Sequence, residues 1–562
     1  MRLNFLSNLR SIALLFPAAR IFACVFWIFL FLTTSPAQSS ITHLEGIVQD
    51  QTGAPITRAE VSLRHESTII AESITDPDGR FKIDAAKVQD ATLFVRAQGF
   101  AHFESKLSTI QTNLLVMEIV LAPAPLSEQV TVTATRTETR IGDTAASIVS
   151  LSSTELSTTA ALTLDDALRQ VPGFSLFRRS GSRTANPTSQ GVSLRGTGAS
   201  GASRAVVMAD GIPLNDPFGG WIYWSRVPRT SINNIEVLRG GASHLYGSAA
   251  LGGVVNIFTR KARSPVLLLE TSYGNQQTAD ASLFAAGRLG QWGASISAET
   301  FHTDGYIIVD ERERGSVDVA ANSRNAVARL MLERKLSSAA NVFAGINVFG
   351  EARSNGTPLQ TNRTHIRQFS AGGDWQSPKA GAFTLRAYGG TQVFDQNFSA
   401  VNSDRSLETL TRVQRVPAQS MGLSIQWSGA VLKRQTFIAG LEAREVRGAS
   451  DEIAYVAGRP TSLIGAGGRE RTIGLFFEDI VRLTPALFIT AGARIDRWRN
   501  FDALSTTRPL SSAPSSINAF PDRSETAFSP HLSLLYKPAD NLSLYASATR
   551  AFRQPTLNEL YR

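Results

Sequence analysis

The stretch LFITAGARID, Leu487–Asp496, decides the fold of the C-terminal half of the chain. Leucine, isoleucine and alanine occupy every second position, while threonine, glycine, arginine and aspartate fill most of the others. A period of two places the two sets of side chains on opposite faces of a β-strand. A soluble sandwich could contain one such strand, but it would rarely place paired charges such as Glu442 and Arg444, in the similar stretch FIAGLEARE, on its inward face. The polar lumen of a membrane β-barrel accepts such charges, so the pattern favours a transmembrane strand.

The same alternation recurs from residue 265 to residue 562, for example in WGASISAETF, FIAGLEARE and LSLYASATRAF. Short connections near residues 290, 337, 379, 485 and 539 alternate with long polar ones at 303–322, 352–364, 397–411, 448–470 and 500–524. Strands joined alternately by short turns and long loops are typical of outer-membrane barrels. The fold class is therefore mostly β, with an antiparallel transmembrane β-barrel over 265–562. We expect Glu442 and Arg444, on the lumen face, to tolerate substitution and the lipid-facing Leu441 not to accept arginine.

The predicted barrel is incomplete. We count about 13 strands, against about 22 in plugged transporters. The last predicted strand, Leu542–Phe552, runs outward and would leave the C-terminus at the cell surface. An open sheet leaves unpaired backbone groups in lipid. We therefore expect residues 38–562, expressed alone, to form no stable barrel.

Composition and the N-terminus exclude several classes. The 562-residue chain carries a formal charge of +9 without a basic stripe, so no nucleic-acid partner is expected. Residues 1–37 have a basic start, an apolar core and the small residues Ser35 and Ala37, which predicts a cleaved signal peptide; the alternative is an uncleaved anchor. The single cysteine, Cys24, lies in this segment, so the rest of the chain can form no disulfide and no thiolate metal site.

Residues 42–122 contain short alternating runs separated by turn signals such as DQTGAP and DPDG. This pattern predicts a small β-sandwich. The segment resembles the carboxypeptidase-regulatory-like domain in the residues Gly46, Val48, Asp50, Gly53, Pro55, Val61, Thr75, Asp76, Gly79, Phe81, Gly99 and Phe100. The resemblance implies an immunoglobulin-like accessory module without catalysis of its own.

Residues 142–262 combine a helical stretch, Leu162–Phe174, with short strands and dense glycines, which predicts an α/β domain. The spacing Gly196-x-Gly198-x-x-Gly201 matches a dinucleotide-binding fingerprint. The apolar run at 205–209 that follows it ends in Asp210-Gly211 and reads as a strand, whereas phosphate binding needs a helix there. A soluble NAD enzyme is therefore the weakest hypothesis.

The run from VPGF at 171–174, through GVSLRGTGASGASRAVVMADGIPLNDP, to IEVLRGGASHLYGSAALGGVVNIFTRK resembles the plug domain of TonB-dependent outer-membrane receptors. The resemblance implies that the glycines permit close packing of backbones inside a barrel lumen. It also implies uptake of a scarce large ligand, most often an iron–siderophore complex or cobalamin, with a TonB protein as partner in an outer membrane.

Residues 123–141 form a linker that, by the same resemblance, carries the TonB box Glu128, Gln129, Val130, Thr131, Val132, Thr133 and Ala134. The segment is rich in β-branched residues and lacks bulky ones. It could offer its backbone edge to TonB as an added strand, or it could be a plain linker.

Two plug loops are candidates for ligand contact. Arginines could meet an anionic ligand, and aromatic rings could stack on it; packing against the barrel wall is the alternative. The candidates are Arg178, Arg179, Arg183, Asn215, Asp216, Trp221, Tyr223 and Trp224.

No catalytic constellation converges in the sequence, and the seven histidines show no metal-ligand spacing. We therefore expect no enzyme activity, no cofactor and no metal site. Two other functions stay open, an oligosaccharide importer of the same superfamily and a barrel-anchored adhesion or structural protein. The motif Arg239–Ser243, RGGAS, departs from the DAS usual in oligosaccharide importers and favours iron chelates or cobalamin.

Overall fold

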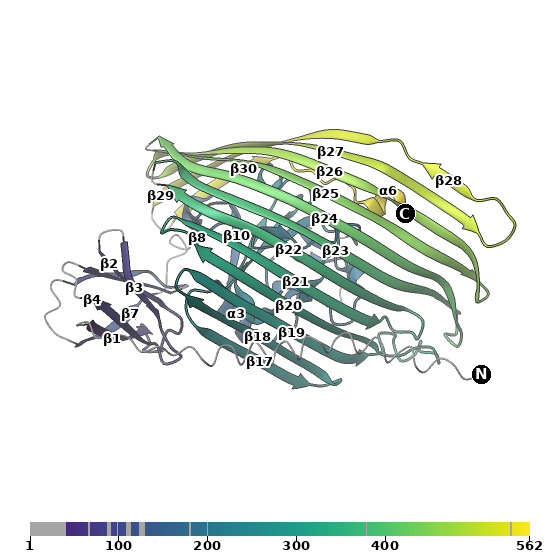
Figure 1. The fold of residues 1–562 in the computed structure, drawn as a ribbon, viewed down its shortest axis with the longest axis horizontal. Coiled ribbons are helices and arrows are strands. Elements are labelled where there is room, and N and C mark those ends of the chain that lie inside the picture. Colours follow the sequence, from purple (N-terminus) through teal and green to yellow (C-terminus); the bar gives the residue numbers. More distant parts are fainter. Residues whose placement is uncertain are drawn as a thin grey trace. The chain divides into compact units, whose positions relative to one another are not determined.

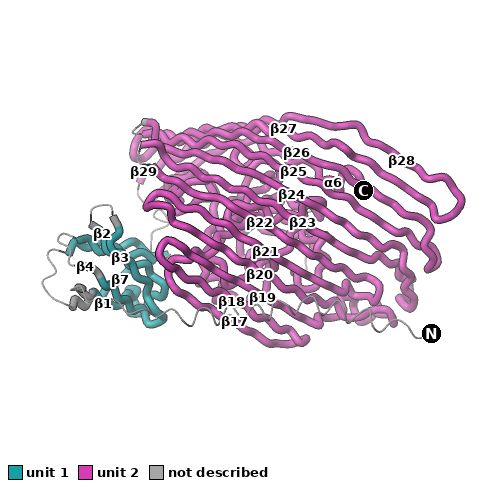
Figure 2. The backbone as a smooth tube through the Cα atoms, in the orientation of Figure 1, with its two compact units in different colours: residues 1–122 teal, residues 123–562 magenta. Residues whose placement is uncertain are grey.

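The computed structural model describes residues 41–65, 68–86, 91–97, 99–107, 114–122, 130–178, 181–198, 200–377, 379–432, 434–539 and 542–562. The predicted signal peptide lies outside these residues. The chain divides into two compact units, Met1–Ala122 and Pro123–Arg562 (Figure 2).

The N-terminal unit is a two-sheet sandwich, as predicted. One sheet has the strand order β4-β1-β7 and the other β3-β2-β5-β6. Buried side chains from both sheets, among them Val48, Leu63 and Leu93, form one core. The strands are β1 (Ile41–Asp50), β2 (Glu60–His65), β3 (Thr68–Ile74), β4 (Arg80–Ala86), β5 (Ala91–Arg96), β6 (Phe103–Leu107) and β7 (Leu114–Leu121).

The plug is an α/β domain around a five-stranded sheet of order β10-β15-β16-β13-β14, in which β13 and β16 are parallel. Its elements are β8 (Val130–Thr131), β9 (Thr139–Arg140), β10 (Ser147–Ser152), α3 (Ser153–Thr158), α4 (Leu164–Leu168), β11 (Phe174–Leu176), β12 (Val192–Leu194), β13 (Ala205–Ala209), β14 (Ile212–Pro213), β15 (Ile232–Arg239), α5 (Ser243–Tyr246) and β16 (Gly253–Thr259). Short 3-10 turns lie at Ile141–Asp143, Pro187–Ser189, Trp224–Arg226 and Arg229–Ser231.

The glycines of the plug serve backbone geometry. Gly196 and Gly198 adopt left-handed φ values of 67° and 83° in the turn after β12, and β13 rather than a helix follows. A Cβ on Gly253 would lie 2.1 Å from the carbonyl oxygen of Leu238. These positions need glycine for a turn and for a close strand contact, as the resemblance implied.

A 14-stranded antiparallel sheet curves around the plug (Figure 1). Its strands are β17 (Val266–Gly274), β18 (Thr278–Leu289), β19 (Trp292–Tyr306), β20 (Ala321–Lys335), β21 (Ala340–Ser354), β22 (Thr361–Ser377), β23 (Gly381–Val401), β24 (Glu408–Leu432), β25 (Gln435–Val456), β26 (Arg459–Thr484), β27 (Leu487–Pro509), β28 (Ser516–Ala519), β29 (Arg523–Ala539) and β30 (Leu542–Thr549). The short β28 pairs only with β27, so the path through the sheet has thirteen strands, with β17 and β30 at its edges.

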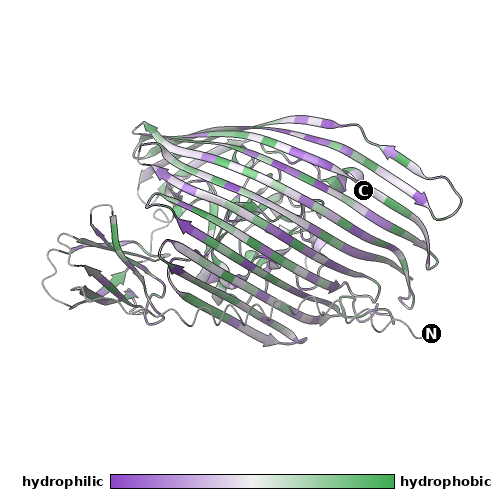
Figure 3. Ribbon diagram, in the orientation of Figure 1, coloured by the Kyte–Doolittle hydropathy of each residue, from purple (hydrophilic) through white to green (hydrophobic). Residues whose placement is uncertain are grey.

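Hydrophobic and hydrophilic residues alternate along the strands of this sheet (Figure 3), and the two faces differ accordingly. Leu441 and Ile495 are 40% and 53% exposed on the outer face, while Arg494 and Asp496 are 3% and 0% exposed on the inner face. No helix in the described part of the chain is long and apolar enough to span a bilayer.

The last thirteen residues differ from the prediction. Instead of continuing outward, the chain turns against the plug and the inner wall after β30. The backbone N–H of Phe552 donates to Ser243 Oγ at 3.1 Å, and that of Asn558, in α6 (Leu557–Tyr561), donates to the carbonyl of Phe218 at 3.1 Å. Arg562 pairs with Glu452 on β25 at 2.8 Å. Polar partners inside the lumen thus hold this segment.

Candidate functional site

The described part of the predicted TonB box, Val130–Ala134, is held by one buried carboxylate. Glu236 on β15 accepts the hydroxyl of Thr131 at 2.7 Å and the backbone N–H groups of Val132 and Thr133 at 3.0 and 2.8 Å. Hydrogen bonds to an ionised group are stronger than neutral ones. Glu236 therefore occupies two consecutive backbone donors of the box, one of which a partner strand on either edge would need. Glu128 and Gln129 lie outside the described residues.

The rest of the box contact is also polar. The hydroxyl of Tyr246 donates to the carbonyl of Thr133 at 2.9 Å, and the amide of Asn256 donates to the Thr133 hydroxyl at 3.3 Å. Only Val130–Thr131 is extended, in a two-residue ladder with β9. The segment is thus docked by hydrogen bonds rather than by bulky apolar side chains. No sequence pattern identifies Glu236 or Tyr246 as its partners.

A charge cluster joins Arg136, two residues after the box, to the barrel wall. Glu442 on β25 pairs with Arg136 at 2.6 Å and with Arg494 on β27 at 2.8 Å, and Arg494 also pairs with Asp496 at 2.8 Å. The Arg136 guanidinium lies 4.4 Å from the centre of the Tyr246 ring. Two cations and two carboxylates therefore balance one another between plug and wall.

This cluster corrects one expectation. The alternation correctly places Glu442 inward, but the residue is not a freely hydrated lumen side chain. Its carboxylate is shared by Arg136 and Arg494, whose side chains are 12% and 3% exposed. Removing one partner of a buried ion pair is strongly destabilising. We therefore expect Glu442 to be sensitive to substitution.

The loop residues from 214 to 224 build the interface between plug and wall. Trp221 and Tyr223 pack against Phe394 and Phe349 of the barrel, with ring centres 5.7 and 5.9 Å apart. Trp224 packs edge-on against Phe174 of the plug at 6.1 Å. All three candidate aromatic residues are at most 4% exposed. In this state their rings fill the interface.

The two polar candidates of the same loop shape its backbone. Asn215 accepts the N–H of Val207 at 3.0 Å and donates to the carbonyl of Ala205. Asp216 accepts the N–H groups of Phe218 and Gly219 at 2.9 and 2.7 Å and the side-chain amide of Gln392. Burial raises the pKa of Asp216 above its ordinary value, against these lowering hydrogen bonds.

The arginine candidates lie apart from this loop. Arg178 is exposed, and Arg183 donates to the Thr278 hydroxyl at 3.2 Å. Arg179 lies outside the described residues. The structure therefore does not bring the arginines and the aromatic residues into one cluster.

The inner wall carries polar residues that the sequence reasoning missed. On the lumen face of β20, β21 and β22, near the ends that lead into the long loops, several buried side-chain atoms have no hydrogen-bond partner among the described residues. These belong to Ser323, Asn325, Glu351, Arg353, Asn362 and Thr364. Alternation could assign them to the lumen face, but not show which atoms lack partners. We call this set the wall group.

Sequence comparisons agree with this architecture. The TonB-dependent receptor-like β-barrel matches residues 291–562, the TonB-dependent receptor plug domain residues 140–254, and the carboxypeptidase regulatory-like domain residues 43–141. The vitamin B12 transporter BtuB of Vibrio cholerae is 33% identical over 178 residues, 31% of this chain and 28% of that protein. An iron-regulated outer membrane virulence protein of the same species is 30% identical over 281 residues, 44% of this chain and 40% of that protein. The chain thus spans less than half the length of these relatives.

Solved structures share the fold. The ferric yersiniabactin uptake receptor FyuA from Yersinia pestis superposes with a TM-score of 0.59 at 18% identity, covering 72% of this chain and 64% of that one. The ferripyoverdine receptor of Pseudomonas aeruginosa gives 0.59 at 15% identity, covering 81% and 66%. The accessory sandwich, the plug and the barrel match in this order along the chain. The chain therefore belongs to the family of TonB-dependent receptors.

Proposed function

We propose that this chain takes up a scarce large ligand across the outer membrane, driven by a TonB protein. The ligand class that we propose is an iron chelate or cobalamin, because the names of its relatives refer to vitamin B12 and to iron regulation. The chain would reach the outer membrane through a cleaved signal peptide at residues 1–37. The observation that carries the proposal is the box segment, with its backbone donors held by Glu236.

The box contacts suit release. Each hydrogen bond to Glu236 is lost when the segment leaves, but a TonB strand offers carbonyl acceptors to the backbone N–H groups along one edge of the segment. Val130 is 36% exposed, and the buried box residues Thr131, Thr133 and Ala134 are small, so little apolar burial opposes the exchange. Pulling on the segment would also separate Arg136 from Glu442, and so pass force to the plug–wall contact.

We also propose a division of labour in the lumen. Arg178, with Arg179 and Arg183, and the wall group contact the ligand, because the wall group offers polar atoms without partners. Trp221, Tyr223, Trp224, Asn215 and Asp216 hold the loop in place, because their contacts are internal.

Val132→Pro tests the proposed function. Proline removes the N–H that strand addition needs, so we expect ligand-dependent uptake to be lost while ligand binding to the same cells persists. Val132→Ala keeps the N–H and serves as the matched control. Normal uptake by the proline variant would show that the energised segment lies elsewhere.

A further inference from the structure

On the outer face of the barrel, the exposed side chains change from apolar to basic at nearly the same height on the neighbouring strands β26 and β27. On β26, outward positions run from Phe477, Leu475 and Ile473 to Arg471 and Arg469 toward the loop end. On β27, Ile495 is followed at the next outward positions by Arg497 and Arg499. The apolar side chains are exposed, Leu475 to 62% and Ile495 to 53%. A basic margin thus follows the apolar band on the loop side.

These arginines face one another directly. Arg471 lies opposite Arg499 in the β26–β27 ladder, and Arg447 on β25 lies opposite Arg469. Like charges in directly opposed pairs destabilise a sheet. Three of these arginines nevertheless lie close to one aromatic ring. The guanidinium carbons of Arg469, Arg471 and Arg499 are 4.8, 5.6 and 5.3 Å from the centre of the Phe501 ring.

Carboxylates do not balance this set. Glu445 pairs with Arg469 and Arg471, Asp502 with Arg469, and Asp522 with Arg499. Within the described residues, Arg447 and Arg497 have no carboxylate partner. We call Arg447, Arg469, Arg471, Arg497 and Arg499 the arginine cluster. Five guanidiniums meet three carboxylates there, so the cluster retains positive charge on an exposed face.

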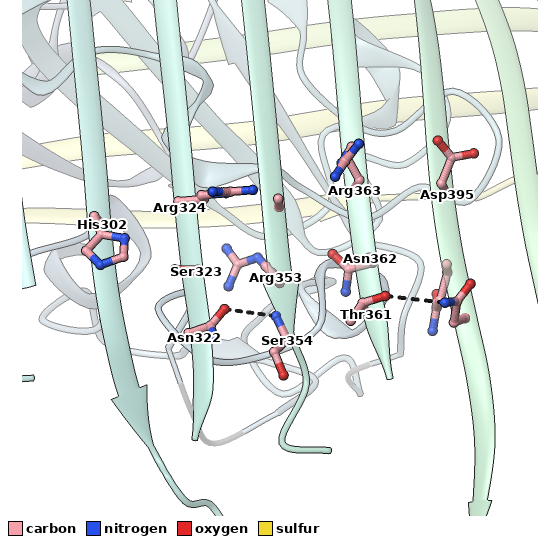
Figure 4. A pocket seen from close by; sticks show the side chains of 13 residues that line it. His302, Asn322, Ser323, Arg324, Arg353, Ser354, Thr361, Asn362, Arg363 and Asp395 are labelled. Atoms are coloured by element: carbon pink, nitrogen blue, oxygen red, sulfur yellow. Dashed lines mark hydrogen bonds between the residues drawn. The ribbon is translucent and has the colours of Figure 1, made fainter. Parts of the chain in front are cut away.

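A second basic surface lies on the same outer face, across strands β19 to β23. A groove of about 520 Å³ has His302, Arg324, Arg363 and Asp395 among its lining residues (Figure 4), and Ala352 lies between the two arginines in the strand register. Arg324, Ala352 and Arg363 are direct cross-strand neighbours, and the small alanine leaves the space open. Among the described residues neither arginine has a carboxylate partner. Exposed Leu330, Ile346 and Phe369 lie on the short-turn side of the groove.

We propose that the arginine cluster binds the phosphorylated headgroup of an outer-leaflet lipid whose acyl chains lie on the apolar band, with the β19–β23 groove as a second place of the same kind. Guanidinium groups bind phosphate in bidentate fashion, and an anion between Arg471 and Arg499 relieves their repulsion. A free anion would satisfy only the charges, whereas a phosphorylated lipid also covers Leu475 and Ile495. The proposal rests on the proposed outer-membrane location.

Lipid retention tests the proposal. Protein purified from outer membranes in a mild non-ionic detergent is analysed by native mass spectrometry for bound phosphorylated lipid. We expect Arg469→Gln/Arg471→Gln/Arg499→Gln to retain at least tenfold less lipid than the wild type. Arg459→Gln/Arg508→Gln/Arg523→Gln removes the same charge from the loop ends of β26, β27 and β29 and should retain lipid normally. Equal loss in both variants, or no loss in the first, overturns the proposal.

A second measurement serves if the triple variant does not fold. Delipidated wild-type protein in detergent is titrated with a phosphorylated lipid, with its dephosphorylated counterpart, and with inorganic phosphate. We expect only the phosphorylated lipid to raise the melting temperature at micromolar concentration, and Arg471→Gln to weaken this effect. Equal stabilisation by inorganic phosphate, or by the dephosphorylated lipid, overturns the assignment. Recovery of the wild type outside the membrane fraction would instead contradict the proposed location.

Discussion

At the scale of single residues, two adjacent residues of β25 lie in different environments. Leu441 faces outward and Glu442 inward, and only Glu442 contacts Arg136 and Arg494. A substitution at either position should therefore act by a different mechanism, one through lipid and the other through the plug.

Leu441→Arg should destabilise the barrel. An arginine on the lipid face costs about 2–4 kcal/mol near the bilayer midplane and less toward the interfaces. The measurement is the folded fraction seen as heat-modifiable migration on gels. Leu441→Ala, which adds no charge, should fold nearly as well as the wild type; equal folding of the arginine variant would contradict the lipid-facing assignment.

Glu442→Gln should loosen the box. The amide carries no charge, so it holds Arg136 and Arg494 less well. In a Cys24→Ser background, the thiol introduced by Val132→Cys should react faster with a thiol reagent in the Glu442→Gln variant than in the protein with Glu442. Glu445→Gln, on the outer face of the same strand, is the control. An unchanged labelling rate would mean that the Arg136 pair does not restrain the box.

At the scale of elements, several strands extend past the predicted loop boundaries. Residues 448–470 were expected to form a long connection, yet β25 continues to Val456 and β26 begins at Arg459. Ladder hydrogen bonds satisfy the backbone in water as well as in lipid, so pairing does not stop where the apolar alternation stops. The five predicted short turns, in contrast, fall where expected, for example between Thr484 and Leu487, whereas the turn between Leu432 and Gln435 was not predicted.

Two outer connections are joined by an ion pair that should depend on pH. Asp318 lies between β19 and β20, and Arg405 between β23 and β24. The hydrogen bond from Arg405 lowers the pKa of Asp318 to about 2. The folded pKa lies below the ordinary value, so the contact is intact above pH 4 and lost as the pH falls from 4 to 2. Pepsin should therefore cleave residues 307–320 faster at pH 2 than at pH 4.

Arg405→Gln provides the control for this experiment. The variant lacks the ion pair at any pH, so the ratio of its cleavage rate to that of the wild type should be largest at pH 4 and approach one at pH 2. A constant ratio across this range would show that the pair does not hold the two connections together.

At the scale of the whole molecule, the sheet has two edge strands that pair on one side only among the described residues. β17 and β30 are its outermost strands, and the path between them has thirteen strands. Unpaired backbone groups in lipid cost several kcal/mol each. Residues 38–562, expressed alone, should therefore be degraded or aggregate; a stable, protease-resistant and heat-modifiable species would contradict this expectation.

The sequence by itself determined the architecture, because strand alternation, turn chemistry and glycine spacing are local patterns. They located the sandwich, the barrel and the inward side of Glu442 and Arg494, while the family resemblance identified the plug and predicted the box segment. Only the tertiary structure decided the partners. Glu236 lies more than a hundred residues from the box, and Arg136, Glu442 and Arg494 meet across plug and wall. The facing of Arg471 and Arg499 depends on the register between two strands. Such contacts follow from how distant elements pack, and no local pattern encodes them.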